Sequence, residues 1–397
     1  MHDSTFGRIV LFLFALGALR YMWVRLRILV PERLHAVGGL IFVLLLFLAF
    51  AYRIFQFGPG LAGEITFAAG GVWIVLLSNW LVACLGMDFI LTLLWIQKRF
   101  WGFSTRSRDV LGTLTRQRNA WIPLVFFMTV LATAGCWYYG YPRQVNYIID
   151  YQKLELARPI DRPVRIAVLS DIHFDPMFPL PKWERLLRDL GKLKPDMIVL
   201  LGDISDLSER DLDGLGLGDK LDSLYAPLGV FAVTGNHEGY MEGRHPELIG
   251  WYELHGIEFL QDQSFCTTSV CLTGRDDLSY VERQKRERAT LTSIAPDPAL
   301  LTKKAWIILD HQPKGLSARD IPGLRVRPDF GISGHTHAGQ FFPWTVVIHW
   351  VWTLSSGRGE LGGIPWFTSS GFGQWGPALR VGSKTELVIL DVSGTKQ

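Results

Sequence analysis

The sequence predicts an α/β protein in two parts, a bundle of about four transmembrane helices followed by a layered α/β sandwich with mixed sheets. The apolar runs long enough to span a membrane all precede residue 142, and from residue 164 onward strand-like and helix-like segments alternate. The charge divides similarly, with 15 Lys+Arg against 8 Asp+Glu in residues 1–161 and 25 against 29 in residues 162–397. We therefore predict a transmembrane domain at residues 1–141, a linker at 142–161 and a globular domain at 162–397.

Four apolar stretches in the first part are predicted to span a membrane. They lie near residues 6–24, 36–53, 67–90 and 120–141, and a span needs about 20 apolar residues. The first stretch is the least secure because Arg20 interrupts it.

The charged residues between these spans predict an orientation. Arg20, Arg25, Arg27 and Arg33 lie between the first and second spans, and Lys98, Arg99, Arg106, Arg108, Arg116 and Arg118 lie between the third and fourth, whereas the middle loop offers only Arg53. Short basic loops stay on the cytoplasmic side. The globular domain is therefore expected on the outer side of the membrane.

The globular part is predicted to consist of alternating strands and helices joined by polar loops. An extended strand is expected inside the linker, and helices are expected at 181–193, 221–225 and 247–255. Strands are expected at 164–169, 197–201, 230–233, 305–309, 330–332 and 387–390, with several short strands between 259 and 272. Cys266 and Cys271 could pair across a short hairpin, although two free thiols fit the sequence equally well.

Polar residues follow five of these strands where each one ends. They are Asp171 and His173, Asp203 and Asp206, Asn236 with His237 and Glu238, His311, and His335 with His337. Asp and His side chains suit divalent ions such as Mn²⁺, Fe or Zn²⁺. Two such ions about 3.5–4 Å apart clamp the attacking and leaving oxygens of a phosphoryl displacement. The sequence therefore predicts a two-metal site.

The order Asp-x-His, Gly-Asp-x-x-Asp, Gly-Asn-His-Glu, a later His and Gly-His-x-His resembles the calcineurin-like metallophosphoesterase superfamily over about residues 163–392. Gly274–Asp277, Ser369–Gly373 and Pro377–Arg380 are similar to its membrane-associated bacterial members, which include enzymes similar to UDP-2,3-diacylglucosamine pyrophosphatases. The resemblance implies a four-layer α/β/β/α sandwich. It also implies a bacterial inner membrane location, with the catalytic domain on the periplasmic side given the orientation above.

The resemblance also implies a role for each residue. Asp171, His173 and His337 would hold one ion, Asn236, His311 and His335 the other, and Asp203 would bridge the two. Mn²⁺ is the expected ion, with Fe or Zn²⁺ as alternatives. A hydroxide bridging the metals would attack, His237 would protonate the leaving oxygen, and Asp206 would orient a catalytic group. Glu238 stands where many relatives have Asp, so its role is open.

The substrate contacts are predicted less directly. Arg275 and Arg380 either contact the substrate phosphate or form surface ion pairs. Phe178 and Trp183 after the first motif, and Trp344, Trp350 and Trp352 after the last, are expected to contact the membrane, the alternative being packing within the protein. The charged run 282–288 is interpreted as a solvated face.

Together these features predict a dinuclear phosphohydrolase acting on a phosphoester or pyrophosphate of a lipid or lipid-linked envelope substrate. Nucleic acid is not expected as a partner because the catalytic domain has a net charge of −4. One alternative is a UDP-2,3-diacylglucosamine pyrophosphatase-like enzyme, whose cytoplasmic substrate conflicts with the orientation. Another is a membrane sensor or scaffold with a vestigial phosphoesterase domain. The sequence leaves the oligomeric state open.

Overall fold

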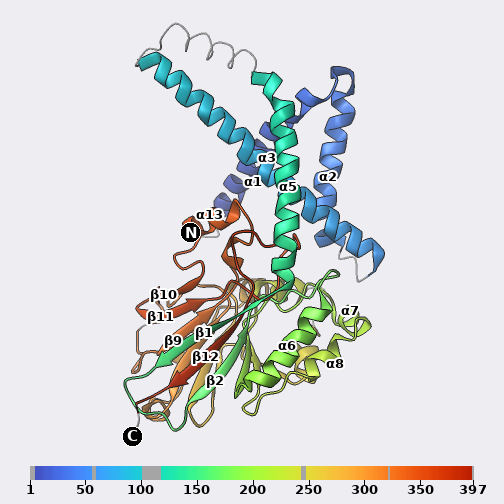
Figure 1. Ribbon diagram of the computed structural model, residues 1–397. Coiled ribbons are helices and arrows are strands. Elements are labelled where there is room, and N and C mark those ends of the chain that lie inside the picture. Colours follow the sequence, from blue (N-terminus) through green and yellow to red (C-terminus); the bar gives the residue numbers. More distant parts are fainter. Residues whose placement is uncertain (1–4, 56–59, 101–117, 243–246, 321, 396–397) are drawn as a thin grey trace. The chain divides into compact units, whose positions relative to one another are not determined.

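The computed structural model describes residues 5–55, 60–100, 118–242, 247–320 and 322–395 (Figure 1). The chain divides into two compact units, one of residues 1–55 and 65–138 and the other of residues 56–64 and 139–397. The first unit is helical. Its long helices are α1 (Thr5–Leu26), α2 (His35–Phe55), α3 (Leu61–Phe100) and α5 (Ile122–Val145), with 3-10 turns η1 (Arg27–Leu29), η2 (Glu32–Leu34) and η3 (Arg118–Trp121).

Two of these helical stretches, Leu61–Gln97 and Asn119–Val145, are long and apolar enough to cross a membrane by length and composition. The structure therefore supports membrane association, while the predicted bundle of four spans is not confirmed. At 40 residues, α3 is about 60 Å long, roughly twice the apolar thickness of a bilayer. Arg25 on α1 forms an ion pair with Asp88 on α3, and the Tyr21 hydroxyl donates to the same carboxylate at 2.7 Å. The basic residues Arg106, Arg108 and Arg116 lie outside the described residues, so the orientation remains a prediction.

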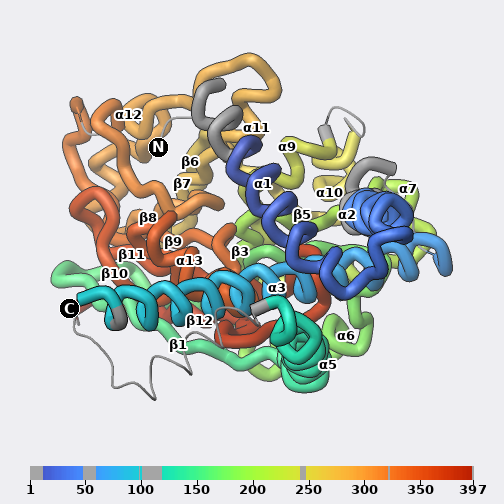
Figure 2. The backbone as a smooth tube through the Cα atoms, turned by 90° about the horizontal axis from the view of Figure 1, so that it is seen from above, coloured from blue at the N-terminus to red at the C-terminus, as the bar shows by residue number. Residues whose placement is uncertain are grey.

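The second unit contains two six-stranded sheets. The first has the order β1-β12-β2-β3-β4-β5 and the second β10-β11-β9-β8-β7-β6. Figure 2 labels every strand of the second sheet. The strands are β1 (Ile148–Glu155), β2 (Val164–Leu169), β3 (Met197–Leu200), β4 (Val230–Ala232), β5 (Ile257–Phe259), β6 (Gln263–Cys266), β7 (Val270–Arg275), β8 (Ala305–Asp310), β9 (Phe330–Ser333), β10 (Gly357–Leu361), β11 (Ile364–Thr368) and β12 (Glu386–Ser393). Within the first sheet β2, β3, β4 and β5 run parallel, and within the second β7, β8, β9 and β11 do.

Three apolar cores separate the layers of this unit. Along β2 the side chains alternate, so that Ala167 and Leu169 enter a core under the helices while Ile166 and Val168 enter a core shared with the second sheet. A third core, around Trp306, covers the far face of the second sheet. This mixed α/β arrangement with two sheets confirms the α/β part of the predicted fold class.

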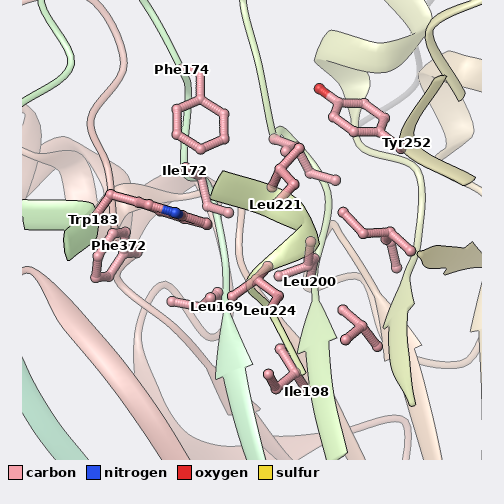
Figure 3. Close-up of a cluster of buried hydrophobic side chains, with 14 of the residues drawn as sticks. Leu169, Ile172, Phe174, Trp183, Ile198, Leu200, Leu221, Leu224, Tyr252 and Phe372 are labelled. Carbon is pink, nitrogen blue, oxygen red and sulfur yellow. The ribbon is translucent and has the colours of Figure 1, made fainter. Parts of the chain in front are cut away.

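The helices of this unit are mostly short. They are α6 (Leu180–Leu193), α7 (Glu209–Gly214), α8 (Leu217–Asp222), α9 (Asn236–Glu242), α10 (Leu248–Leu254), α11 (Leu278–Arg283), α12 (Leu291–Ile294) and α13 (Trp344–Val351), with 3-10 turns η4 (Leu300–Thr302) and η5 (His337–Gly339). Helix α6 buries Trp183, Leu186 and Leu190 at helical spacing and ends at Lys194 in the left-handed conformation. Figure 3 shows the core that this helix covers, with Trp183 among the labelled side chains.

Three sequence predictions change. The linker at 142–161 contains β1, which pairs in parallel with β12, so this stretch belongs to the first sheet. The helix expected at 221–225 corresponds to α8, which begins earlier and ends at Asp222. A further short helix, α7, precedes it in the polar segment. The apolar stretch after the last metal motif, for which the sequence predicted no helix, forms helix α13.

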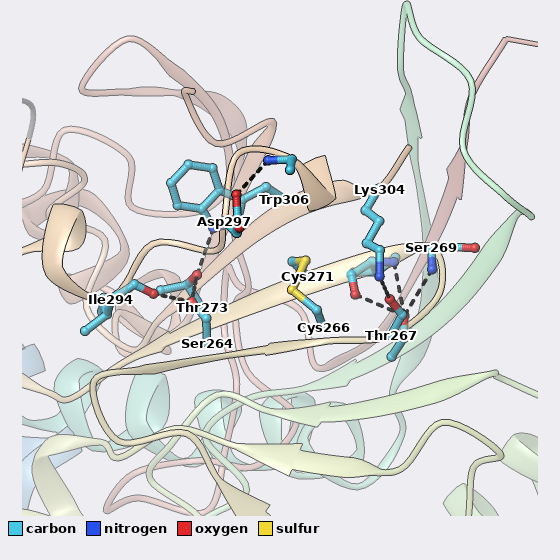
Figure 4. Close-up of a disulfide and its surroundings, with 12 residues drawn as sticks. Ser264, Cys266, Thr267, Ser269, Cys271, Thr273, Ile294, Asp297, Lys304 and Trp306 are labelled. Carbon is cyan, nitrogen blue, oxygen red and sulfur yellow. Dashed lines mark hydrogen bonds between the residues drawn. A yellow bond between two sulfur atoms is a disulfide. The ribbon is translucent and has the colours of Figure 1, made fainter. Parts of the chain in front are cut away.

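The two cysteines of the β6–β7 hairpin form a disulfide. Cys266 and Cys271 are direct cross-strand partners in this antiparallel hairpin (Figure 4). The structure therefore selects the disulfide from the two alternatives that the sequence left open.

Candidate metal centre

The predicted metal ligands meet at the carboxyl ends of strands from both sheets. Asp171 and His173 follow β2, Asp203 follows β3, Asn236 opens α9 after β4, His311 follows β8, and His335 and His337 follow β9. The carboxyl ends of parallel strands share one edge of a sheet, which is where open α/β sheets place ligand sites. The donor atoms form three overlapping groups, each with its atoms within 4.8 Å of one another: Asp171, His173 and His337; His173, Asp203 and His237; and Asp203, His311 and His335.

The first group directs three donors to one point. His173 Nε2 lies 3.2 Å from His337 Nε2, and His337 Nε2 lies 3.4 Å from Asp171 Oδ1. Two imidazole nitrogens that face each other beside a carboxylate oxygen are an arrangement that a shared cation stabilises. All three side chains are buried.

The group of Asp203, His311 and His335 is built on His311. Its Nε2 atom lies 3.2 Å from Asn236 Oδ1, 3.2 Å from Asp203 Oδ2 and 3.3 Å from His335 Nδ1. Its Nδ1 atom is 2.6 Å from the Leu201 carbonyl oxygen, which fixes the orientation of the ring.

Asp203, a member of this group, also approaches His173 of the first group. Its Oδ2 atom lies 3.7 Å from His173 Nε2 on one side and 3.2 Å from His311 Nε2 on the other, while its Oδ1 atom accepts the backbone N–H of His237 at 2.8 Å. One carboxylate between two donor sets is what a pair of closely spaced cations needs, and the Asp, His and Asn donors suit divalent ions. The residues present therefore fit a two-metal centre, although they do not identify the metal.

Backbone conformation supports a functional role for these residues. Asp171, His173, Asp203, His335 and His337 all have positive φ angles, between 46° and 70°. This left-handed conformation is costly for residues other than glycine, and such strain collects at functional sites. Gly334 permits the close approach of the loops, because a Cβ atom there would lie 1.7 Å from Ser170 Oγ and 2.4 Å from Asp171 Oδ2.

His237 and Asp206 form a side-chain pair beside these groups. The Asp206 carboxylate contacts His237 Nδ1 and lies 3.4 Å from His173 Nδ1, so it orients both rings. The rings of His173 and His237 are 4.6 Å apart. The structure thus places Asp206 where a group that orients His237 must lie.

The electrostatics of the centre divide the donors into charged and neutral forms. Burial raises the pKa of a carboxyl group, but His237 and His311 overcome this effect and hold the pKa of Asp203 well below its usual value. Burial, reinforced by His311, lowers the pKa of His335 to about 3. Burial and His173 likewise lower the pKa of His337. These shifts favour an ionised Asp203 and neutral imidazoles on His335 and His337, the forms that bind metals.

Glu238 has a role that the sequence left open. Its Oε2 atom accepts the backbone N–H groups of Asp203 at 2.9 Å and Gly235 at 2.7 Å, and its Oε1 atom accepts that of Ile204 at 2.8 Å. This buried carboxylate therefore holds the loop that carries Asp203. The sequence offered one signal, an acidic side chain directly after Asn236 and His237.

The prediction of two substrate-contacting arginines does not match their positions. Arg380 is fully buried; its guanidinium lies 3.2 Å from His337 Nδ1 and donates to the carbonyl oxygens of His337 and Gly373. Arg275 is also buried and pairs with Asp320 at 2.8 Å. Arg380 therefore holds His337 in place, and Arg275 joins the end of β7 to the segment that carries Asp320.

The aromatic residues predicted to contact the membrane separate into two sets. Trp183 is fully buried and Phe178 is 8% exposed, so both belong to the core and the prediction for them is wrong. Trp344 and Trp350 on α13 are 47% and 81% exposed. Trp352 caps α13 and contacts the ring of His335 at 5.2 Å.

The charged run 282–288 is more than a solvated face. Arg286 pairs with Asp276, and the largely buried Arg288 pairs with Asp310 at 2.6 Å. These two arginines therefore tie the segment to the ends of β7 and β8, because both carboxylates lie where those strands end.

Comparison with known proteins agrees with this geometry. Residues 164–339 match the family model described as calcineurin-like phosphoesterase. The chain is 28% identical over 304 residues to an uncharacterized metallophosphoesterase of Campylobacter jejuni, covering 75% of this chain and 77% of that protein. It is 29% identical over 344 residues to a Danio rerio "transmembrane protein with metallophosphoesterase domain" (79% and 72%) and 30% identical over 259 residues to an uncharacterized metallophosphoesterase of Aquifex aeolicus (64% and 92%). The chain therefore belongs to the calcineurin-like metallophosphoesterases, hydrolases that act on phosphoesters.

Proposed function

We propose that this chain is a membrane-anchored, dinuclear metal-dependent phosphohydrolase that cleaves a phosphoester or pyrophosphate bond of a lipid or lipid-linked envelope substrate. The observation that carries the dinuclear part is the position of Asp203, whose carboxylate is shared by two sets of donor atoms. Single-metal sites need no such shared ligand.

The roles of the side chains follow from their positions. Asp171, His173 and His337 would hold one ion, Asn236, His311 and His335 would hold the other, and Asp203 would contribute to both. When bound, two divalent ions supply an activated water and neutralise the charge of the phosphate.

His237 is assigned the protonation of the leaving oxygen. Asp206 lies against its Nδ1 atom and keeps a proton there, so the Nε2 atom, 3.8 Å from Asp203 Oδ2, faces the reaction centre.

The proposal of a lipid substrate is supported by helix α13. This helix begins a few residues after the last metal ligand, His337, and has no buried residue. Its exposed apolar residues include Trp344, Val346, Trp350 and Val351, and Trp side chains are enriched at membrane interfaces. An apolar helix joined to a ligand loop gives a phosphohydrolase the means to engage a substrate embedded in lipid.

The proposed location is the outer face of the bacterial inner membrane. The basic loops of the sequence support this orientation, and the Cys266–Cys271 disulfide is the form expected in an oxidising compartment. A C-terminal alkaline phosphatase fusion should therefore be active, and a C-terminal fluorescent fusion of the kind that matures only in the cytoplasm should be dark. The reverse pattern would contradict the orientation.

The hydrolase proposal is tested with the purified full-length protein in detergent. Metal content and turnover of bis(p-nitrophenyl) phosphate are measured for the wild type and for Asp203→Asn. We expect close to two divalent ions per wild-type chain, with both metal content and turnover greatly reduced in the variant. A wild-type protein with neither metal nor turnover would favour a scaffold with a vestigial domain. Hydrolysis of envelope phospholipids and lipid-linked sugars in mixed micelles then identifies the substrate class.

A further inference from the structure

Two exposed cations stand beside the metal centre, each connected to one of its histidines through an aromatic ring. On one side the ring of Tyr240, 42% exposed, lies 5.4 Å from the ring of His237. The guanidinium carbon of Arg283 lies 4.3 Å from the centroid of Tyr240. Arg283 ends helix α11 and is exposed to solvent.

The second cation is linked to a different histidine. The ring of Trp352 lies 5.2 Å from that of His335, and Lys314 Nζ lies 6.0 Å from the centroid of Trp352. Lys314 is exposed and follows the metal-ligand segment of His311 by three residues. In both cases one aromatic ring contacts a metal-site histidine and also has a cation within the range in which a cation is attracted to an aromatic face.

These two cations differ from the other basic residues near the centre. Arg275, Arg286 and Arg288 each pair with a carboxylate, and Arg380 is buried against His337. Within the described residues, by contrast, neither Arg283 nor Lys314 has an ion-pair partner among Asp and Glu. Their positive charge is therefore available to a ligand.

The net negative charge of the domain makes these two cations important for binding an anion. Residues 162–397 carry 25 basic and 29 acidic side chains, so the domain as a whole does not attract an anion. An anionic substrate then depends on local positive charge around the site. The two metals compensate the phosphate that is cleaved, whereas cations at the rim can compensate a further group.

We propose that Arg283 and Lys314 form an anion subsite that binds a second phosphate group of the substrate, beyond the one that is cleaved. The inference rests on the proposed phosphohydrolase function and narrows it to substrates with at least two phosphate groups. Tyr240 contacts Arg283 and His237, and Trp352 contacts Lys314 and His335, so each cation is one ring away from a histidine of the metal centre.

The test measures how strongly the protein prefers inorganic diphosphate over orthophosphate. Binding of each anion to the Mn²⁺-loaded, full-length protein in detergent is followed by calorimetry. The variants are Arg283→Gln, Lys314→Gln and the double substitution, with Arg319→Gln, another exposed cation of the same domain, as the matched control. Arg283→Lys and Lys314→Arg keep the charge and should recover most of the preference.

We expect the diphosphate-to-orthophosphate preference to fall about ten-fold in the double variant, the usual worth of a hydrogen bond to a charged group, and to stay unchanged in Arg319→Gln. An unchanged preference in the double variant, or an equal fall in the control, overturns the subsite. Turnover of bis(p-nitrophenyl) phosphate by the wild type is measured in parallel. Its absence refutes hydrolysis, whereas the binding preference still decides whether the subsite exists.

Discussion

Replacing Arg380 with methionine tests whether this residue positions a metal ligand or binds substrate. The guanidinium donates to the carbonyl oxygens of His337 at 3.1 Å, Lys384 at 2.9 Å and Gly373 at 2.6 Å. Methionine fills similar space and donates to none of them. A buried acceptor left without its donor costs about 1–3 kcal/mol, so we expect a destabilisation on the order of 3 kcal/mol.

The more specific effect is on metal binding. The bond from Arg380 to the His337 carbonyl oxygen fixes the backbone of a proposed metal ligand, and groups that position a metal-ligating histidine typically contribute about 10–100-fold to metal affinity. Arg380→Met should therefore weaken metal binding by about that factor. At saturating metal the KM for a chromogenic diester should stay within about two-fold of the wild type, because the guanidinium does not reach the substrate.

Arg275→Met is the matched control. Arg275 is an equally buried arginine, but its partners are Asp320 and the Ala289 carbonyl oxygen. It should lower stability and leave metal affinity unchanged. Metal titration followed by steady-state kinetics measures both quantities. A raised KM with normal metal affinity in Arg380→Met would refute the positioning role and indicate that Arg380 contacts the substrate.

Three further outcomes are expected. His237→Ala should lower kcat by about 10²–10⁴-fold, the usual range for a general acid, while metal content by elemental analysis stays near that of the wild type; loss of metal would make His237 a ligand. Burial raises the pKa of Asp320, but Arg275 and Ser317 overcome it and hold the value at about 2. This carboxylate therefore stabilises the fold above pH 4, and its contribution is lost as the pH falls towards 2. Asp320→Asn should cost about 1–2 kcal/mol at pH 7 after allowance for solvent screening; urea unfolding should show the gap to the wild type closing below pH 4, and a constant gap would exclude this cause. Trp344→Ser with Trp350→Ser should reduce turnover of phospholipid in vesicles and spare a soluble diester; equal loss on both would argue against membrane contact by α13.

The metal centre was the part of the molecule that could be predicted best from the sequence. Each ligand follows a short apolar strand, and a polar residue at the end of a parallel strand is placed by local pattern and sheet geometry alone. The buried strands were found for the same reason, because a strand such as β2 is apolar along its whole length.

Whether a single side chain is buried could not be predicted in the same way. Trp183 and Trp350 both lie in apolar stretches next to a metal motif, yet one is fully buried and the other is 81% exposed. The difference depends on what packs against each residue: Trp183 meets Phe174 at 5.1 Å, a partner nine residues away that the chain brings close only by folding. The role of Arg380 was wrongly predicted for the same reason, since the hydrogen-bond partners of its guanidinium lie up to 43 residues away.

Residues that lie next to the metal centre also form hydrogen bonds with the end of α5. The backbone N–H of Arg380 donates to the Gly140 carbonyl oxygen at 3.1 Å, and the buried ammonium group of Lys182 donates to the carbonyl oxygens of Gln144, at 2.8 Å, and Phe372. The residue after Phe372, Gly373, donates its N–H to the Asp171 carbonyl oxygen at 2.8 Å. The last turns of α5 are thus part of the catalytic unit, which begins at Tyr139 rather than at the predicted boundary of 162.

This boundary can be tested with two shortened chains. One that begins at Tyr139 keeps the acceptors at Gly140 and Gln144, whereas one that begins at Asn146 loses both and leaves the Lys182 ammonium short of a partner. At about 1–3 kcal/mol for each lost acceptor, the second chain should be less stable by roughly 2–6 kcal/mol and should bind metal more weakly. Thermal unfolding and metal titration compare the two. Equal metal affinity in both chains would show that the end of α5 is a tether only, because its hydrogen bonds would then contribute nothing to the site.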